Sequence, residues 1–462
     1  MSNKTIYALS TFYGQSSVAI VRISGPESLM VAKKLCNLKD IKPRYANFCK
    51  LIDGKGEVFD EGLAIYFKKP NSFTGEDVLE IQVHGSVMVI NKLIKELSKL
   101  KNLVPAKPGE FSKRGFLNNK RNLMYFEGIN NLIAAESETQ LQLAKRQAFG
   151  HKKNPTFRWK KKIQEIKAII NAQIEFSDDF QDSNIISNLI KEIKKLKNEI
   201  QKEISLSTNI DKIKHGHRVI LIGPVNTGKS SLLNFLFQDN KAITSKYKGT
   251  TTDQIEHSLN LLGEKVTFVD SAGIRDSKRF IEKEGIKKTI SNINSNNNFI
   301  LVLSPEVLSE KNLKNIDSLI SKIIKKNFVV ALNKTDLSSS KSRFDTFKRR
   351  HPQIPTSKYL EVSCKKQSDS PKKLKSFKEF IWKKLLKNTK SFNDDVYFSE
   401  LRHYQCLENI NFKLDLALSN IQEIEIASNF MDEALYELDN IFGRHDKEEE
   451  LDIIFRKFCI GK

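Results

Sequence analysis

The residues whose types and spacing most clearly allow chemistry run from Gly223 to Ser231 and read Gly-Pro-Val-Asn-Thr-Gly-Lys-Ser-Ser. They fit the phosphate-loop pattern G-x-x-x-x-G-K-[ST], in which backbone N–H groups surround phosphate oxygens at the N-terminus of a helix. Lys229 can reach the β- and γ-phosphates of a nucleotide, and the hydroxyl of Ser230 can bind Mg²⁺. A strand expected over 218–222 and a helix expected after the loop favour this interpretation over a chance match. The predicted nucleotide contacts of this stretch are Asn226, Thr227, Gly228, Lys229, Ser230 and Ser231.

Further signals for a nucleotide site follow in order along the chain. Gly-Thr-Thr-Thr-Asp over 249–253 offers a threonine hydroxyl for Mg²⁺, although a plain Thr-rich turn explains this stretch equally well. Asp270 ends an apolar strand and can bind Mg²⁺ through water, and the N–H of Gly273 can contact a γ-phosphate. The predicted contacts of this second stretch are Asp270, Ser271, Ala272 and Gly273.

Two later signals concern the base of the nucleotide. In Asn333-Lys334-Thr335-Asp336, the carboxylate of Asp336 can accept both N1–H and N2–H of guanine, a donor pair that adenine lacks. Ser363-Cys364-Lys365 follows another expected strand and can contact the guanine oxygen through backbone N–H groups. Because all of these signals occur in one order and each adjoins an expected strand, they predict a GTPase domain.

The group that orients the attacking water is less obvious. GTPases of the Ras type place a glutamine directly after the glycine of the D-x-x-G motif, but here that position is Ile274, which cannot hydrogen-bond to water. Glu282 lies a few residues further along and can either orient water or lie on a helix surface. Arg275 is equally compatible with a surface ion pair, so no arginine finger is assigned.

The elements that must position these residues divide the chain into four segments. Residues 1–119 mix strands with helices, and over 77–84 apolar side chains alternate with Glu80, Gln82 and His84. Helical periodicity marks 120–213 and 387–462. Residues 214–386 alternate apolar strands with helices, which is typical of a doubly wound sheet. The predicted fold is therefore a multidomain α/β protein: an N-terminal α+β domain, a helical domain in two parts, and an inserted Ras-like P-loop GTPase domain.

Composition restricts the class of protein. The chain has 462 residues, 39% of them hydrophobic, which predicts several folded domains. No run of 18 apolar residues and no signal-peptide pattern occur, and the five cysteines are scattered. We therefore expect a soluble protein of the reducing cytoplasm, without a membrane partner. The net charge of +22 favours an anionic partner such as nucleic acid, although a general abundance of lysine explains it equally well.

Beyond the GTPase motifs, the chain resembles the tRNA uridine-modification GTPase family MnmE, also called TrmE. The resemblance rests on Ile-Val-Arg-Ile-Ser-Gly-Pro at 20–26, Phe-Thr-Gly-Glu-Asp at 73–77, Lys-Pro-Gly-Glu-Phe-Ser-Lys-Arg at 107–114, the GTPase motifs, and Phe-Cys-Ile-Gly-Lys at 458–462. It thus extends from residue 5 to residue 462. The chain departs from the family pattern at 14–17, 126–128, Pro224-Val225, Thr252 and Ser271.

The resemblance implies an N-terminal domain that forms a homodimer and binds a tetrahydrofolate one-carbon derivative (5-formyl- or 5,10-methylene-tetrahydrofolate). The matching folate positions are Arg22, Glu80, Lys120 and Lys462. Glu80 could pair with N–H donors of the pterin, as Asp336 would with guanine. Cys459 matches a family cysteine whose role we leave open.

The resemblance also implies activation of GTP hydrolysis by K⁺. The matching K⁺ ligands are Asn226, Ser245, Tyr247 and Thr250, and Ser230 and Thr251 match the Mg²⁺ ligands. The matching nucleotide loop comprises Ser245, Lys246, Tyr247, Lys248, Gly249, Thr250 and Thr251. Glu282 matches the glutamate that orients water, and a K⁺ would occupy the place of an arginine finger's charge.

The activity that the resemblance implies is tRNA modification with an FAD-dependent partner, MnmG (GidA), in a heterotetramer-type complex. It would add an aminomethyl or carboxymethylaminomethyl group at C5 of the wobble uridine of certain tRNAs. A GTPase switch in ribosome assembly shares the GTPase motifs and the basic charge, but does not explain the N-terminal motifs or the 458–462 segment. An inactive structural homologue is a second alternative, which GTP turnover would test.

Overall fold

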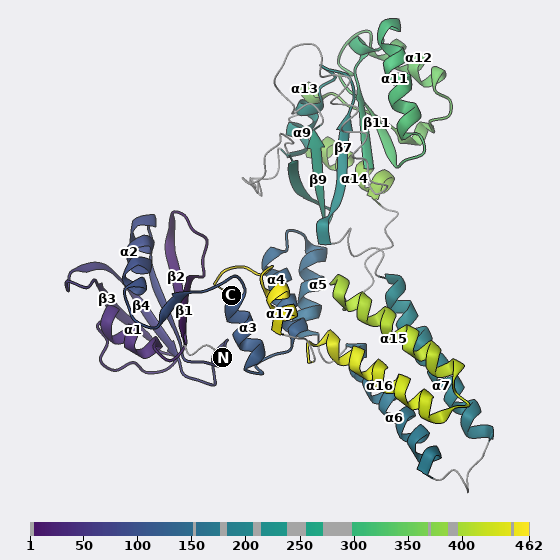
Figure 1. Ribbon diagram of the computed structural model, residues 1–462. Helices are drawn as coiled ribbons and strands as arrows, with labels where there is room; N and C mark the ends of the chain where they lie inside the picture. The colour runs from purple at the N-terminus through teal and green to yellow at the C-terminus, as the bar shows by residue number, and fades with distance from the viewer. Residues whose placement is uncertain are drawn as a thin grey trace. The chain divides into compact units, whose positions relative to one another are not determined.

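The computed structural model describes residues 4–150, 154–175, 183–206, 214–237, 256–270, 298–367, 371–386, 396–444 and 448–461. They belong to two compact units, one formed by Met1–Ala134, Ala144–Ile204 and Glu400–Lys462, the other by Ala135–Leu143 and Ser205–Ser399 (Figure 1). The first unit therefore receives two separate parts of the chain after the N-terminal segment. Helix α5 (Glu138–Phe149) spans one of the boundaries between the units, at Leu143 and Ala144.

The first unit begins with a six-stranded sheet of order β3-β4-β5-β2-β1-β6. Its strands are β1 (Thr5–Leu9), β2 (Ser16–Ser24), β3 (Ala46–Ile52), β4 (Val58–Phe67), β5 (Val78–Gly85) and β6 (Leu103–Pro105). All neighbouring strands are antiparallel except β1 and β6. Helices α1 (Ser28–Leu35) and α2 (Val87–Ser98) share one hydrophobic core with the sheet.

The alternation predicted for β5 is confirmed. Leu79, Ile81 and Val83 are buried in the core, whereas Glu80 is only partly buried and His84 is exposed. The polar face of β5 continues onto β2, where Arg22 is the antiparallel partner of Glu80. The sheet thus has one apolar face under α1 and α2 and a second face that can carry a polar site.

Helix α3 (Glu110–Leu117) packs against part of that second face, where its Phe111 contacts Ile6 and Ala8 of β1. The remaining helices of the unit are α4 (Leu123–Ala134), α6 (Pro155–Glu175), α7 (Ser183–Leu206), α15 (Leu401–Ser419), α16 (Ile424–Ile441) and α17 (Glu448–Phe455). The apolar stripe Leu189, Ile193, Leu196 and Ile200 of α7 is buried. An amphipathic helix of this kind is stable because neighbouring elements cover its apolar face.

The second unit contains a sheet of order β12-β11-β10-β7-β9-β8. Its strands are β7 (His217–Ile222), β8 (Glu256–Leu261), β9 (Glu264–Asp270), β10 (Asn298–Leu303), β11 (Phe328–Leu332) and β12 (Tyr359–Glu361). All pairs are parallel except β8 with β9. Near-continuous apolar runs are typical of parallel strands buried on both faces, and every residue of β10 and β11 is buried.

Helices cover both faces of this sheet. Helices α9 (Lys229–Phe237) and α14 (Pro371–Ile381) share one core with it, and α11 (Glu310–Ile323) and α12 (Ser340–Arg350) share the other. A short helix, α13 (Cys364–Gln367), follows β12. The predicted multidomain α/β fold with a doubly wound P-loop domain is confirmed. Strand β8, which the hydrophobic pattern did not predict, pairs with β9 at the edge of the sheet.

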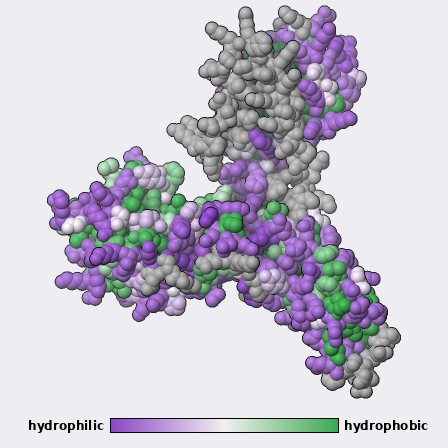
Figure 2. All heavy atoms as spheres, viewed as in Figure 1, coloured by the Kyte–Doolittle hydropathy of each residue, from purple (hydrophilic) through white to green (hydrophobic). Residues whose placement is uncertain are grey.

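Hydrophilic residues dominate the face of the molecule drawn in Figure 2. No helix among the described residues is both long enough and apolar enough to cross a bilayer.

Candidate functional site

The phosphate loop connects β7 to α9 at the carboxyl end of a central parallel strand. The loop contains three residues with positive φ: Gly223 at 147°, Asn226 at 63° and Gly228 at 87°. A Cβ on Gly223 would lie 2.2 Å from the carbonyl oxygen of Val302, and a Cβ on Gly228 would lie 2.3 Å from Nδ2 of Asn333. Both glycines are therefore required by backbone conformation and by close neighbours.

Lys229, the first residue of α9, is only 6% exposed. Its ammonium group donates hydrogen bonds of 2.8 Å to the carbonyl oxygens of Gly223 and Pro224. The hydroxyl of Thr227 donates to the same Pro224 oxygen at 3.0 Å. These contacts hold a positive charge against the loop at the N-terminus of a helix, an arrangement that favours phosphate. Ser230 and Ser231 follow in the first turn of α9.

The predicted guanine site lies at the ends of two neighbouring strands. Asn333 follows β11, and its side-chain amide donates a hydrogen bond of 3.0 Å to the carbonyl oxygen of Thr227 in the phosphate loop. Its side-chain oxygen accepts a contact of 3.4 Å from the thiol of Cys364, which follows β12. The hydroxyl of Ser363 donates to Asp336 at 2.6 Å. The structure thus brings the base motif and the phosphate loop together through the Asn333 side chain.

Three further features describe this base site. Burial raises the pKa of the Cys364 thiol to about 11, so this side chain is a neutral packing group near neutral pH. Lys334 adopts the left-handed region, with φ at 60°, and its ammonium group pairs with Glu306 at 2.5 Å. Lys365 lies in α13, directly after Cys364.

Most of the remaining predicted residues of this site lie outside the described part of the chain. Asp270 is the last residue of β9, so its backbone lies at the carboxyl edge of the sheet. The predicted residues outside the described part of the chain are Ser245, Lys246, Tyr247, Lys248, Gly249, Thr250, Thr251, Ser271, Ala272, Gly273 and Glu282. Two of the predicted metal ligands carry exposed side-chain oxygens: Ser230, with a hydroxyl in the first turn of α9, and Asn226, with an amide in the phosphate loop. Oxygen atoms of this kind are the ligands that hard cations such as Mg²⁺ prefer.

A second site lies in the first unit, on the polar face of the N-terminal sheet. Arg22 donates to one oxygen of Glu80, Oε1, through Nε at 2.9 Å and lies 2.8 Å from it through Nη2. Both side chains are mostly buried, with exposures of 15% and 18%. The two residues are direct cross-strand partners, so the register of β2 and β5 creates the pair.

Two aromatic rings and a backbone carbonyl complete the surroundings of Arg22. The guanidinium carbon lies 5.7 Å from the ring centre of Phe73 and 5.9 Å from that of Phe111. Its Nη1 donates to the carbonyl oxygen of Gly461 at 3.0 Å. The predicted residue Lys462 follows directly in the sequence, outside the described residues.

The other two predicted residues of this region lie at its margins. Lys120 reaches the loop between β4 and β5, where it donates to the carbonyl oxygen of Pro70 at 2.6 Å. This loop also carries Phe73. Cys459 is exposed, and its carbonyl oxygen accepts a hydrogen bond from the N–H of Gly109 at 3.3 Å.

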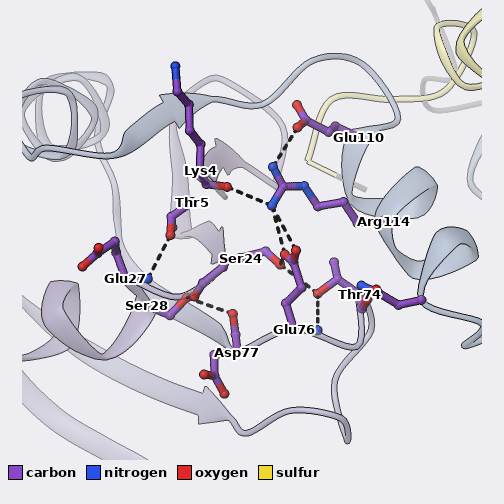
Figure 3. A network of polar contacts seen from close by, with 12 residues as sticks. Lys4, Thr5, Ser24, Glu27, Ser28, Thr74, Glu76, Asp77, Glu110 and Arg114 are labelled. Atoms are coloured by element: carbon purple, nitrogen blue, oxygen red, sulfur yellow. Dashed lines mark hydrogen bonds and ion pairs between the residues drawn. The ribbon is translucent and has the colours of Figure 1, made fainter. Parts of the chain in front are cut away.

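The N-terminal sequence motifs meet in one polar network beside this site (Figure 3). Ser24 contacts the hydroxyl of Thr74 at 2.7 Å and donates to Glu76 at 2.7 Å. Arg114 contacts Glu76 at 3.1 Å and Glu110 at 2.9 Å. In the sequence, these motifs indicated only the family resemblance. Their physical role is to join β2, the β4–β5 loop and α3, and so to fix the two aromatic rings near Arg22.

Two family models match the chain: "GTP-binding protein TrmE N-terminus" over residues 5–120 and "MnmE helical domain" over residues 123–459. The chain is 36% identical to "tRNA modification GTPase MnmE" of Rickettsia typhi, with 99% of this chain and 100% of the relative covered. It is 33% identical to the protein of the same name from Aliarcobacter butzleri, with 100% and 99% covered.

Among solved structures, Aquifex aeolicus Era is 21% identical, covering 43% of this chain and 67% of its own, but its TM-score of 0.28 is too low to support any assignment. The two family models and the full-length relatives agree with each other and with the GTPase motifs. The chain belongs to the MnmE family of tRNA modification GTPases.

Proposed function

We propose that this chain is a K⁺-dependent GTP hydrolase that acts with an FAD-dependent partner of the MnmG type. Together they would add an aminomethyl or carboxymethylaminomethyl group at C5 of the wobble uridine in certain tRNAs. The observation that carries the nucleotide part is the bond from Asn333 to Thr227, which joins the base motif to the phosphate loop. Membership of the MnmE family supports the tRNA part.

The main predicted residues of the nucleotide site have distinct roles in this proposal. Asp336 selects guanine, because its carboxylate accepts two N–H donors that adenine does not offer. Lys229 neutralises the phosphates, and Ser230 with Thr251 holds Mg²⁺. Asn226, with Ser245, Tyr247 and Thr250, holds the K⁺ that stabilises the charge developing on the phosphates. Glu282 orients the attacking water.

The Arg22–Glu80 pair supports binding of a reduced folate. Both contacts from Arg22 reach the same carboxylate oxygen of Glu80, and no described residue donates a hydrogen bond to the other oxygen, Oε2. That oxygen suits an N–H donor of a pterin. Basic groups at Lys120 and Lys462 suit the glutamate tail of the folate, which would supply the one-carbon unit.

The proposed division of labour follows the four segments of the chain. Residues 1–119 bind the folate and form a homodimer, and residues 214–386 hydrolyse GTP. Residues 120–213 and 387–462 form the helical domain, and the GTPase segment is inserted between them in the sequence. The homodimer and its MnmG-type partner would work in the cytoplasm as a heterotetramer-type complex, in which GTP hydrolysis drives a conformational change.

GTP turnover in K⁺ and in Na⁺ at equal ionic strength tests the nucleotide part. We expect faster turnover in K⁺. Asn226→Gly should abolish the K⁺ stimulation, because glycine accepts the positive φ of this position but offers no side-chain oxygen. Asn226→Asp, which retains an oxygen, should keep part of it. Equal turnover of the unaltered protein in both salts would contradict the proposed K⁺ dependence.

A further inference from the structure

The segment Cys459–Gly461, here called the tail segment, lies on the polar face of the N-terminal sheet. The carbonyl oxygen of Gly461 accepts two hydrogen bonds, both of 3.0 Å, from the hydroxyl of Ser10 and from Nη1 of Arg22. Ser10 precedes Gly461 by 451 positions in the chain. The tail segment is therefore held on the same arginine that contacts Glu80.

The register of the sheet explains why Ser10 and Arg22 converge on one oxygen. Arg22 of β2 is the antiparallel partner of Ala8 in β1, and the N–H of Ser10 continues this ladder by donating to Ile20 at 2.7 Å. Ser10 lies two residues after Ala8, and side chains two residues apart share a face of a strand. Ser10 and Arg22 are thus diagonal neighbours on the polar face.

Position 461 accepts only glycine in this arrangement. Its φ is +92°, a conformation that strains other residues. A Cβ there would lie 2.5 Å from the carbonyl oxygen of Leu9 and 2.9 Å from the Cα of Ser10. The backbone of the tail segment therefore approaches the end of β1 more closely than any side chain would allow.

The first residue of the tail segment is also anchored, because the carbonyl oxygen of Cys459 accepts a hydrogen bond from the N–H of Gly109 at 3.3 Å. Gly109 also approaches α17, which precedes the tail segment, so closely that a Cβ on it would lie 2.2 Å from the carbonyl oxygen of Phe455. Lys113 of α3 pairs with Asp452 of α17 at 2.7 Å. The tail segment is thus held at Gly109 on one side and at Ser10 and Arg22 on the other.

We propose that Ser10 and Gly461 are positioning residues of the folate site, which hold the tail segment on Arg22 and so couple its docking to ligand binding. This inference rests on the proposed folate function. Arg22 uses Nε and Nη2 for Glu80 and Nη1 for Gly461, so the tail segment restricts the orientations open to the guanidinium. It also fixes Gly461, the residue directly before Lys462 in the sequence. Coupling of this kind is reciprocal. If docking of the tail segment strengthens ligand binding by a given factor, ligand binding stabilises the docked tail segment by the same factor.

Equilibrium binding of 5-formyl-tetrahydrofolate to the full chain provides the first measurement. Ser10→Ala should weaken binding about three- to tenfold, the size expected from one hydrogen bond. Ser10→Thr, which keeps the hydroxyl, should restore most of the affinity, and Gly461→Ala should weaken binding more than Ser10→Ala. The matched control is Ser98→Ala, whose hydroxyl donates to a backbone carbonyl in α2, away from the tail segment.

Thiol alkylation at the exposed Cys459 provides a second measurement that a purely structural role would not change. We expect the folate to slow alkylation of Cys459 in the unaltered protein and to have much less effect in Ser10→Ala. The buried cysteines Cys36, Cys49 and Cys406 serve as internal references, since their slow alkylation reports that the variant is folded.

The two proposals fail in different ways. If the unaltered protein does not bind 5-formyl-tetrahydrofolate, the proposed folate function fails and this inference fails with it. If the unaltered protein binds the folate and both Ser10→Ala and Gly461→Ala bind it equally well, the inference alone is wrong. Unchanged GTP turnover in both variants would show that the nucleotide site is intact during these comparisons.

Discussion

The side-chain amide of Asn333 donates a hydrogen bond of 3.0 Å to the backbone carbonyl of Thr227, across 106 residues of sequence. This contact is buried and joins the motif proposed to bind the base to the phosphate loop. The same amide excludes a side chain at residue 228, since a Cβ there would lie 2.3 Å from it. The two proposed parts of the nucleotide site therefore depend on each other's backbone geometry.

Asn333→Ala should weaken GDP and GTP binding about 5- to 150-fold, because removal of one partner from a buried hydrogen bond costs about 1–3 kcal/mol. Titration with a fluorescent guanine nucleotide measures the effect. The matched control is Asn327→Ala. Asn327 donates to Asn298 and to the carbonyl oxygen of Leu385 in the same unit, so its loss should lower stability without changing nucleotide affinity. Equal nucleotide affinities for Asn333→Ala and the unaltered chain would contradict the linkage.

Asp336→Asn should exchange guanine for xanthine as the preferred base. The carboxylate accepts hydrogen bonds from guanine, whereas an amide can donate to the oxygen that xanthine carries in place of the guanine amino group. Ser363 donates to Asp336 at 2.6 Å and would orient either side chain. Turnover of GTP and of xanthosine triphosphate by both proteins is the measurement. A variant that loses GTP turnover without gaining any with xanthosine triphosphate would count against this base assignment.

Glu127 of α4 should make the first unit sensitive to acid. Burial by itself raises the pKa of this carboxyl group, but the neighbouring charges of His403 and Arg402 outweigh burial, and the pKa of Glu127 is lowered. A carboxylate with a lowered folded pKa stabilises the fold above its unfolded pKa of about 4.3. That stability is lost as the pH falls from there through the folded pKa.

Glu127→Gln should therefore lower the free energy of unfolding by about 3–5 kcal/mol at neutral pH, because it leaves the Arg402 charge without its carboxylate. Below the folded pKa the difference between the two proteins should become small. Urea unfolding followed at several pH values measures this convergence. If the two proteins differ in free energy of unfolding by the same amount down to the lowest pH, the charge of Glu127 does not contribute to stability.

Arg114→Lys should destabilise the network of Figure 3 although it keeps the charge. Arg114 is 11% exposed; its Nη1 contacts Glu76 and the carbonyl oxygen of Lys4, and its Nη2 contacts Glu110. A lysine ammonium cannot make these contacts at the same time, because it lacks the planar, forked arrangement of donors of a guanidinium. Thermal unfolding should show a clear loss for Arg114→Lys and little for Arg121→Lys. The Arg121 side chain donates to the adjacent carbonyl oxygen of Lys120 and lies over the ring of Tyr125, contacts that do not join separate elements. Equal melting of the two variants would contradict a role for the network.

The nucleotide domain was predictable because its chemistry is local in sequence. Apolar runs such as Phe328–Leu332 identify buried parallel strands, and motifs such as the phosphate loop and Asn333–Asp336 directly follow a strand. Strand β8 escaped prediction because its sequence, Glu-His-Ser-Leu-Asn-Leu, has few apolar residues, and because it lies at the edge of the described sheet. The bond from Asn333 to Thr227 could not be predicted from spacing, since it depends on the order of strands in the sheet.

The N-terminal site was predictable only in part. Arg22 and Glu80 came from the family resemblance, and the alternation of β5 placed Glu80 on a polar face. The roles of Ser10 and Gly461 were missed because their contact joins opposite ends of the sequence. The glycine in the 458–462 motif was the available signal, since a glycine in a functional motif often marks a positive φ or a close backbone approach.

The central claim is that this chain modifies the wobble uridine of tRNA in a GTP-dependent way. Nucleoside mass spectrometry of tRNA from a deletion strain, complemented with the unaltered chain or with Lys229→Ala, tests it most directly. The account predicts that the aminomethyl-type wobble modification disappears on deletion, returns with the unaltered chain and does not return with Lys229→Ala. Persistence of the modification in the deletion strain, particularly together with abnormal ribosomal particles, would contradict the claim and favour a role in ribosome assembly.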